Sequence, residues 1–285
     1  LWGDRVLIDE QDVKNGRVLC KGRGRTGYIS RNAYGTEPLL EIYVIDVGQG
    51  DGILIKCPDP NTNTLGKHIL IDGGYMREKQ PTGKNAADFV DWKFNEEYGL
   101  DEVTIDDMIV SHCDADHYGG LWDLVNDSEE AKEELSCDSV KVKNLYHAGV
   151  AWLRMKKGAN RSLGEIKDGK LQNIITGKTS MERHLRKDKY PRLQGEYGDF
   201  LDTFLQTQPD ARIRFIGHKV KASRPKYLPG YEPANSNVTL EVLAPLYYKT
   251  GNKIEINDFG SKSKNSNGNS ILLSLRFGNF KMLLT

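Results

Sequence analysis

A short apolar run that leads directly into a cluster of histidines and aspartates constrains this fold more than any other feature of the sequence. Met108 to Ser111 has the composition of a buried strand, and the loop His112-Cys113-Asp114-Ala115-Asp116-His117 follows it without a break. In an extended segment, residues two apart point the same way, so the first histidine and the first aspartate can bind one ion. The later aspartate and histidine lie where the chain turns and can face a second ion. Gly119-Gly120 then lets the backbone fold sharply, and a helix is expected from Leu121.

Imidazole nitrogens and carboxylate oxygens at this density are typical of a metal site, and they fit Zn²⁺ or Mn²⁺. The predicted metal ligands are His112, Asp114, Asp116 and His117. Cys113 lies inside the same loop, so a role as an additional ligand or an oxidation site stays open. The simpler interpretation is a reduced thiol, because none of the four cysteines forms a C-x-x-C pair.

Apolar runs on both sides of this loop predict a mixed domain of the α+β class. Strands are expected at 40–46, 52–56, 68–72, 140–146, 213–216, 238–243, 271–277 and 280–284, the last two joined by a turn at Gly278-Asn279. Residues 85–98 have helical spacing that ends at Gly99, and residues 200–205 predict a second helical piece. The polar stretch of about 150–235 is interpreted as an insertion, and residues 262–269 as a mobile loop.

The first 38 residues form a separate pattern of short β-like runs cut by glycines. This pattern predicts a small SH3-like β module at 1–38, of the kind that binds a protein partner, before a main domain at 39–285. Lys+Arg and Asp+Glu are both 40, so the total charge does not indicate a nucleic-acid-binding protein. No run of about 18 apolar residues is present, so we expect no membrane contact and a cytoplasmic location.

Several motifs together resemble one family. The loop 112–117 is similar to the H-x-[HD]-x-D-H motif of the metallo-β-lactamase superfamily, and its aspartate at the third position resembles the ComEC/Rec2 competence-protein branch. Asp46-Val47-Gly48-Gln49-Gly50-Asp51 matches the D-V-G-Q-G-D signature of that branch, and Ile69 to Gly74 its I-D-x-G strand end. Residues 267–272 and 280–285 resemble two later strands. The resemblance covers about 39–147 and 236–285, and it implies an αββα sandwich.

The resemblance also implies roles for individual residues. Asp116 lies at the water side of the site, where it orients the attacking water as the catalytic residue. Asp46 and Asp72 hold the histidine rings by hydrogen bonds, although Asp46 equally fits a turn-stabilising carboxylate. Asp114 in place of a histidine adds a hard oxygen and tilts the preference towards Mn²⁺ or Mg²⁺.

This chain departs from the family pattern near its end. The bridging aspartate and the last histidine of the family follow the final strand, and the sequence stops at Thr285 before both. We therefore expect a piece of a longer protein whose domain is incomplete at its C-terminus. Asn269 stands where many members place another histidine, and His147 closes a strand. Both are assigned to substrate binding, with a surface location as the alternative for His147.

Two local basic stretches indicate the substrate. Residues 183–192 and 212–226 are rich in lysine and arginine, and Phe215 and Tyr227 accompany the second. Interleaved cations and aromatic rings suit a nucleic-acid strand, although solvated basic loops also explain them. With the resemblance, they predict a metal-dependent phosphodiesterase or nuclease acting on DNA or a nucleotide. A binding or scaffold protein with a degenerate site, and a hydrolase of a small ester or lactam, are the alternatives.

Overall fold

A six-stranded mixed sheet forms the centre of the molecule. The computed structural model describes residues 6–22, 24–35, 39–58, 65–157 and 161–284; Thr285 and the predicted domain boundary near 38 lie outside them. The strand order is β13-β8-β7-β6-β5-β4. Strand β5 pairs antiparallel with both β4 and β6. The strands β6, β7, β8 and β13 run parallel to one another. The strands are β4 (Glu41–Val44), β5 (Ile53–Cys57), β6 (Lys67–Ile71), β7 (Glu102–Val110), β8 (Ser139–His147) and β13 (Arg212–Phe215).

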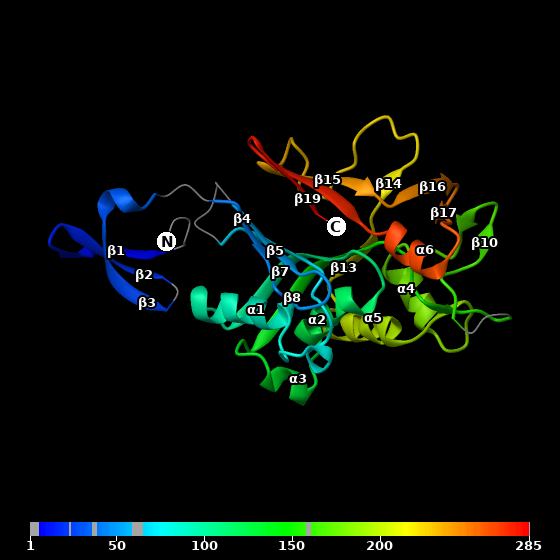
Figure 1. Ribbon diagram of the computed structural model, residues 1–285, viewed down its shortest axis with the longest axis horizontal. Helices are drawn as coiled ribbons and strands as arrows, with labels where there is room; N and C mark the ends of the chain where they lie inside the picture. Colours follow the sequence, from blue (N-terminus) through cyan, green and yellow to red (C-terminus); the bar gives the residue numbers. More distant parts are fainter. Residues whose placement is uncertain (1–5, 23, 36–38, 59–64, 158–160, 285) are drawn as a thin grey trace.

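Helices cover one face of this sheet, as Figure 1 shows. They are α1 (Ala86–Trp92), α2 (Ala115–Val125), α3 (Glu129–Glu133), α4 (Lys178–Leu185) and α5 (Glu196–Thr207). Asn85 and Asp88 form a capping box at the start of α1, which continues as a π-helix, η3 (Lys93–Glu97), so the predicted helix at 85–98 is confirmed. None of the helices in the described part of the chain is long and apolar enough to cross a membrane.

A second, three-stranded antiparallel sheet packs on the opposite face of the main sheet. It consists of β15 (Val238–Ala244), β18 (Leu272–Phe277) and β19 (Phe280–Leu284), which confirms the predicted C-terminal hairpin. Ile55, Ile71 and Ile109 of the main sheet share one buried cluster with Leu240 and Leu275 of the second sheet. The described residues therefore stack as a helical layer, a sheet and a second sheet, which are three of the four expected layers. The mixed α and β class is confirmed.

The stretch of about 150–235 is not simply a polar insertion. Helix α5 lies in the helical layer, where Phe200 and Phe204 are fully buried in the same cluster as Leu121 of α2. Strand β13 completes the main sheet beside β8. Residues 196–215 are therefore part of the helical layer and of the main sheet, and the helical piece predicted at 200–205 and the strand predicted at 213–216 are found there. The insertion itself stays a prediction. The other short elements are β9 (Leu153–Arg154), β10 (Ile166–Lys167), β11 (Lys170–Leu171), β12 (Arg192–Leu193), β14 (His218–Lys219), β16 (Leu246–Thr250) and β17 (Lys253–Asn257).

Residues 262–269, predicted as a mobile loop, form helix α6 (Lys262–Gly268) and its end. The Ser261 side chain caps the helix by accepting a hydrogen bond from the Lys264 amide at 3.3 Å. Asn265 is buried, accepts from the Phe259 amide at 2.6 Å and donates to Asp258 at 2.7 Å. The prediction was wrong because these polar side chains bond to the helix and its flanks instead of to water.

The N-terminal region is a three-stranded antiparallel sheet of β1 (Leu7–Lys14), β2 (Arg17–Gly22) and β3 (Arg25–Ser30), followed by a 3₁₀ turn, η1 (Arg31–Ala33). In the part of this region that the structure describes, only Val18 and Cys20 are buried hydrophobics. The described strands therefore form an open sheet and not a closed SH3-like barrel, because three strands with so small an apolar centre cannot close. Its binding of a protein partner stays a prediction.

Candidate metal centre

The four predicted ligands meet at the carboxyl edge of the main sheet. Strand β7 ends at Val110, and Asp114 has an extended backbone (φ −91°, ψ 147°) as the N-cap of α2. Helix α2 begins at Ala115, earlier than the expected start at Leu121, so Asp116 and His117 lie on its first turn. The rings of His112 and His117 are thereby brought side by side, with centroids 3.8 Å apart.

Close backbone packing fixes the first turns of α2. A side chain on Gly120 would place its Cβ 2.1 Å from the Gly73 carbonyl oxygen, and one on Gly119 would lie 2.2 Å from the Met76 nitrogen. Gly119-Gly120 therefore lies inside the helix and permits close contact, whereas the sequence suggested a sharp fold of the backbone. Gly50, at φ +99°, leaves equally little room against the Asp116 carbonyl, so the 46–51 turn supports the same helix.

One buried carboxylate orients both histidines. Asp72 is fully buried and accepts hydrogen bonds from the Ser111 amide at 2.8 Å, the Ser111 hydroxyl at 2.5 Å and His117 Nδ1 at 2.7 Å. Since the Ser111 hydroxyl donates to Asp72, its oxygen accepts from His112 Nδ1, 3.0 Å away. Both Nδ1 atoms are thus engaged as donors, and both Nε2 atoms keep a lone pair for an ion.

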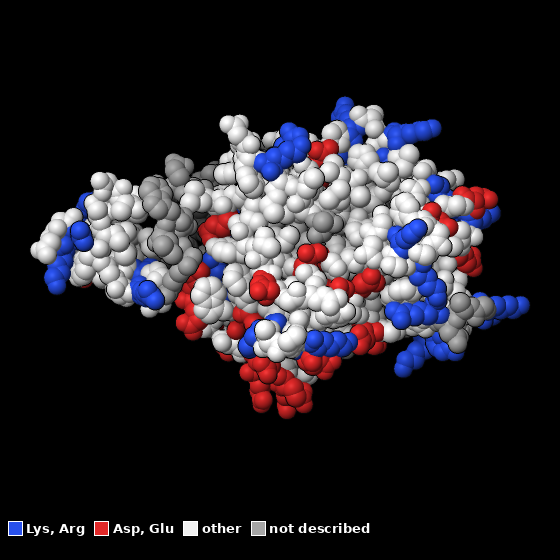
Figure 2. Space-filling model, in the orientation of Figure 1, with Lys and Arg blue, Asp and Glu red and all other residues white. Residues whose placement is uncertain are grey.

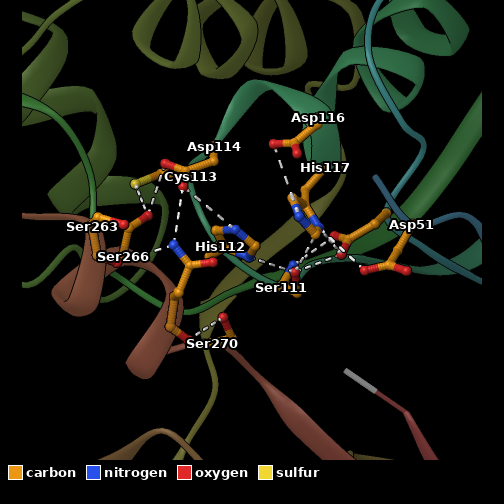
Figure 3. A network of polar contacts seen from close by, with 12 residues as sticks. Asp51, Ser111, His112, Cys113, Asp114, Asp116, His117, Ser263, Ser266 and Ser270 are labelled. Carbon is orange, nitrogen blue, oxygen red and sulfur yellow. Dashed lines mark hydrogen bonds and ion pairs between the residues drawn. The ribbon is translucent and has the colours of Figure 1, made fainter. Parts of the chain in front are cut away.

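Aspartates flank the two free Nε2 atoms. His112 Nε2 lies 3.7 Å from Asp114 Oδ2, and His117 Nε2 lies 3.9 Å from Asp116 Oδ1. Figure 3 shows Asp114 and Asp116 on the α2 side of the rings and Asp51 beside His117. Nitrogen and carboxylate donors in this mixture fit Zn²⁺ or Mn²⁺, so the residues present are compatible with the predicted ion.

A second candidate group shares one of these histidines. Asp51, Asp72 and His117 have ligand atoms within 4.8 Å of one another. In this group the carboxylates approach Nδ1, at 2.7 Å for Asp72 and 3.9 Å for Asp51. Because Nδ1 donates its proton to Asp72, it has no lone pair for an ion. We therefore place the candidate ion on the Nε2 side and treat Asp72 as the residue that orients the ring.

The electrostatics of the site favour a cation. Burial and the neighbouring His117 lower the pKa of His112. Burial also opposes a charge on His117, but the hydrogen bond and charge of Asp72, with Asp116 and Asp51, outweigh it and raise the pKa of His117. Two imidazoles among several carboxylates leave an excess of negative charge, which a divalent ion neutralises.

Helix α6 supplies contacts from residues that were not among the predicted site residues. The buried Ser266 hydroxyl donates to Asp114 Oδ1 at 2.9 Å, and Asn267 Nδ2 donates to Asp114 Oδ2 at 3.4 Å. On the other side, Gln49 Nε2 lies 3.5 Å from Asp116 Oδ2. Ser266 is 152 positions from Asp114, so no local spacing relates the two residues. The motif similarity around 267–272 was the one signal that this segment approaches the loop.

Cys113 points towards the same helix. Its sulfur lies 3.6 Å from the Ser266 hydroxyl, and burial raises the pKa of the thiol to about 12. A protonated, buried thiol is a poor metal ligand and reacts slowly with oxidants. The structure therefore favours the structural thiol over the ligand and oxidation-site alternatives.

Three predicted site residues lie elsewhere. Asp46 is exposed and accepts from the Gly48 amide at 3.1 Å in its own turn, so it does not hold a histidine ring. Asn269 is buried and donates to the carbonyls of Asn257 and Asn265, which fixes the end of α6 and leaves no amide hydrogen to point at a substrate.

His147 lies neither at a cleft rim nor on the surface. It is 1% exposed, its Nδ1 accepts from the Gly149 amide at 3.1 Å, and burial lowers its pKa to about 4. A side chain this buried does not contact a substrate, so its assignment to substrate binding is wrong. In the sheet, Phe215 of β13 is its register partner. Phe215 in turn packs edge-on against Tyr247, with centroids 5.4 Å apart, and is not free to stack on a base.

Comparison with known proteins gives no relative from which a function could be inferred. No protein-family model matches the chain, and no curated protein matches it either.

Proposed function

We propose that this chain is a metal-dependent hydrolase of the metallo-β-lactamase type that cleaves phosphodiester bonds, as a nuclease or a nucleotide phosphodiesterase. One observation carries the proposal: two adjacent histidines, held at Nδ1, present both Nε2 atoms to flanking aspartates. A purely structural histidine pair gains nothing from keeping both lone pairs free. The three observed layers and the site at a sheet edge support the αββα sandwich, and the sequence motifs at 46–51, 69–74 and 112–117 support the ComEC/Rec2-like branch.

Each residue has a distinct task in this proposal. His112, His117 and Asp114 hold the ion, and Asp72 with Ser111 keeps the rings in the binding tautomer. A bound Zn²⁺ or Mn²⁺ ion supplies Lewis acidity, which acidifies a water molecule and polarises the scissile bond. Asp116, 23% exposed and on the first turn of α2, orients the attacking water and accepts its proton. Gln49 steadies this carboxylate from the 46–51 turn.

The donor set favours a phosphodiester over a lactam or ester. Oxygen-rich sites prefer hard ions such as Mn²⁺ and Mg²⁺, which bind phosphate oxygens well. In the described chain, the other histidines (His68, His147, His184 and His218) are not hydrogen-bonded or ion-paired to the predicted ligands. The site therefore has as many aspartates as histidines, and the oxygens of Asp114 and Asp116 make it harder than an all-histidine site.

The test combines metal content with substrate choice. The purified protein is expected to bind Zn²⁺ or Mn²⁺ and, with Mn²⁺, to cleave single-stranded DNA and bis-p-nitrophenyl phosphate but not p-nitrophenyl acetate. Asp116→Asn should lower kcat by about 10²–10⁴-fold, as loss of a general base does. Asp46→Asn is the matched control and should leave kcat unchanged. Cleavage of the acetate alone would indicate an ester hydrolase, and bound metal without hydrolysis of any substrate would indicate a binding protein.

A further inference from the structure

A cavity of about 440 Å³ lies on the face of the second sheet that points away from the main sheet. Leu240, Leu273 and Leu275 point into the buried cluster between the two sheets, so the side chains that alternate with them lie on the opposite face. Those side chains, together with residues of the segment before β15, line the cavity: Thr239, Glu241, Ser274, Arg276, Pro225, Tyr227 and Pro233. Figure 2 shows both basic and acidic side chains along the upper edge of the molecule, where Figure 1 places the second sheet. Among the described residues that line the cavity, none is a predicted metal ligand, so the cavity is separate from the candidate metal centre.

The pairing of the strands brings these side chains together in rows across the sheet. Tyr227 forms an isolated β-bridge with Glu241, and Ser274 is the register partner of Glu241 on β18. Thr239 and Arg276 form the next pair on the same face. Cross-strand partners have Cβ atoms about 4.5–5.5 Å apart, and diagonal neighbours lie about 7–8 Å apart. Glu241 and Arg276 are such diagonal neighbours, so their charged groups line the same space beside Ser274.

The polar groups that line the cavity do not satisfy one another. Ser274 is 2% exposed, and its hydroxyl has no hydrogen-bond partner among the described residues. In the part of the chain that the structure describes, neither Glu241 nor Arg276 forms an ion pair, although opposite charges on neighbouring strands stabilise a sheet when they pair. A buried hydroxyl without a partner is destabilising unless an external group bonds to it. The cavity therefore presents a donor, an anion and a cation that are all available to a ligand.

The arrangement of these groups specifies the charge of the ligand. The carboxylate of Glu241 has the Tyr227 ring as its cross-strand neighbour, and an acid beside an aromatic ring suits an ammonium group. The Arg276 guanidinium matches the two oxygens of a carboxylate, to which the hydroxyls of Ser274 and Thr239 can also donate. A simple anion would be repelled by Glu241, and a simple cation by Arg276. A ligand that carries a positive and a negative group close together satisfies both.

We propose that this cavity binds a free α-amino acid with an apolar side chain. The ammonium group of the ligand binds Glu241, and its carboxylate binds Arg276 and accepts a hydrogen bond from Ser274. Its side chain lies against the apolar surface of Pro225 and Pro233. The volume of the cavity is within the range of small-molecule sites, about 300–1,000 Å³. The site is independent of the proposed hydrolase activity, so either assignment can fail without the other.

Isothermal titration calorimetry with L-leucine tests the assignment. N-acetyl-L-leucine lacks the ammonium group and L-leucinamide lacks the carboxylate, so both should bind at least about tenfold more weakly. Arg276→Ala and Glu241→Gln should each weaken the binding of L-leucine about tenfold, the loss of one charge-assisted contact. In Arg276→Ala, L-leucine and L-leucinamide should bind about equally, because the group that distinguishes them is gone. Arg17→Ala, at an exposed arginine of β2, is the matched control and should bind like the wild type.

Ser274→Ala separates a ligand contact from a role in the fold. Because the hydroxyl has no partner to lose among the described residues, the variant should keep its unfolding free energy. It should bind L-leucine about fivefold more weakly, the loss of one hydrogen bond. No saturable binding of L-leucine up to about 10 mM would overturn the inference. So would equal binding of L-leucine and L-leucinamide by the wild type, or a loss of stability in Ser274→Ala with unchanged affinity.

Discussion

Two clusters of buried ionisable side chains lie in the same domain, and they differ in charge balance and in the ligand atoms that they leave free. The first, here the Lys93 cluster, consists of Glu41, Tyr43, Lys56, Lys93 and Glu97. Lys93 is fully buried, donates to Tyr43 at 2.5 Å and to Glu97 at 2.6 Å, and lies 3.6 Å from Glu41. Glu41 also binds Lys56 and accepts from Tyr43. In this cluster each charge is matched by an opposite one.

The candidate metal centre has the opposite balance. Asp72 and Ser111 use the Nδ1 atoms of both histidines, but the Nε2 atoms have only carboxylates near them, at 3.7 and 3.9 Å. The Lys93 cluster therefore contributes to the fold, whereas the metal centre keeps donors for a ligand. Buried charges alone do not distinguish a functional site from a structural ion-pair cluster. Side-chain atoms that still have a lone pair free to bind a ligand do.

The largest expected effect comes from breaking the Lys93 cluster. Lys93→Met leaves Glu97 without its cation and Glu41 with Lys56 alone. Removing one partner of a buried pair costs about 3–5 kcal/mol of unfolding free energy. Urea denaturation measures the loss, and the metal content should not change. Lys84→Met removes an exposed pair with Asp88 and should cost about 0.5 kcal/mol or less. Equal effects of the two substitutions would contradict a structural role for the buried cluster.

The next effect is a pH dependence beside the same cluster. Burial lowers the pKa of His68, which is 2% exposed, from 6.5 to about 4, and Lys56 and Lys93 add to the shift while Asp106 opposes it. The unfolded chain therefore takes up a proton below pH 6.5 that the folded protein refuses until about pH 4. Stability should fall by about 3 kcal/mol as the pH drops through this window. His68→Gln should remove that part of the pH dependence, and identical wild-type and variant pH profiles would refute it.

Asp72→Asn tests whether the buried carboxylate of the candidate metal centre serves metal binding. Asparagine tolerates the left-handed backbone at this position (φ +55°) but binds His117 Nδ1 without a charge. Loss of such a partner typically lowers metal affinity about 10- to 100-fold. Chelator competition with Zn²⁺ or Mn²⁺ measures the affinity, with Asp46→Asn as the control. Unchanged affinity would show that Asp72 serves the fold alone.

The sequence predicted the parts of this site that are local in the chain. Strand β7, the ligand loop and Asp72 could be identified because alternation, apolar runs and ligand density act within a few residues. Asp46 and Asp51 could not be separated by sequence. Both sit in one turn, but only the packing of Gly50 on α2 decides that Asp51 lies 3.9 Å from His117 while Asp46 faces solvent.

Errors arose where the folded chain, and not water, surrounds or binds polar side chains. Helix α6 has no apolar stripe, and Asn265 and Ser261 replace it with hydrogen bonds that only the folded backbone supplies. His147 was expected at a cleft rim or on the surface because a strand end alone does not show what packs around it, and the folded chain buries its side chain. Local pattern therefore predicts which polar residues come together at the loop better than it predicts what surrounds them.

Ser266→Ala gives the smallest effect and tests whether α6 belongs to the metal centre. The hydroxyl is buried and holds Asp114 Oδ1 at 2.9 Å, so its loss frees the carboxylate to leave its ligand orientation. A hydrogen bond of this kind contributes about 1 kcal/mol, which corresponds to about fivefold in metal affinity. Ser263→Ala on the same helix changes an exposed residue and should have no effect. If Ser266→Ala lowers the unfolding free energy but not the metal affinity, α6 supports the fold, as the Lys93 cluster does. If the metal affinity falls while the stability is unchanged, α6 belongs to the site.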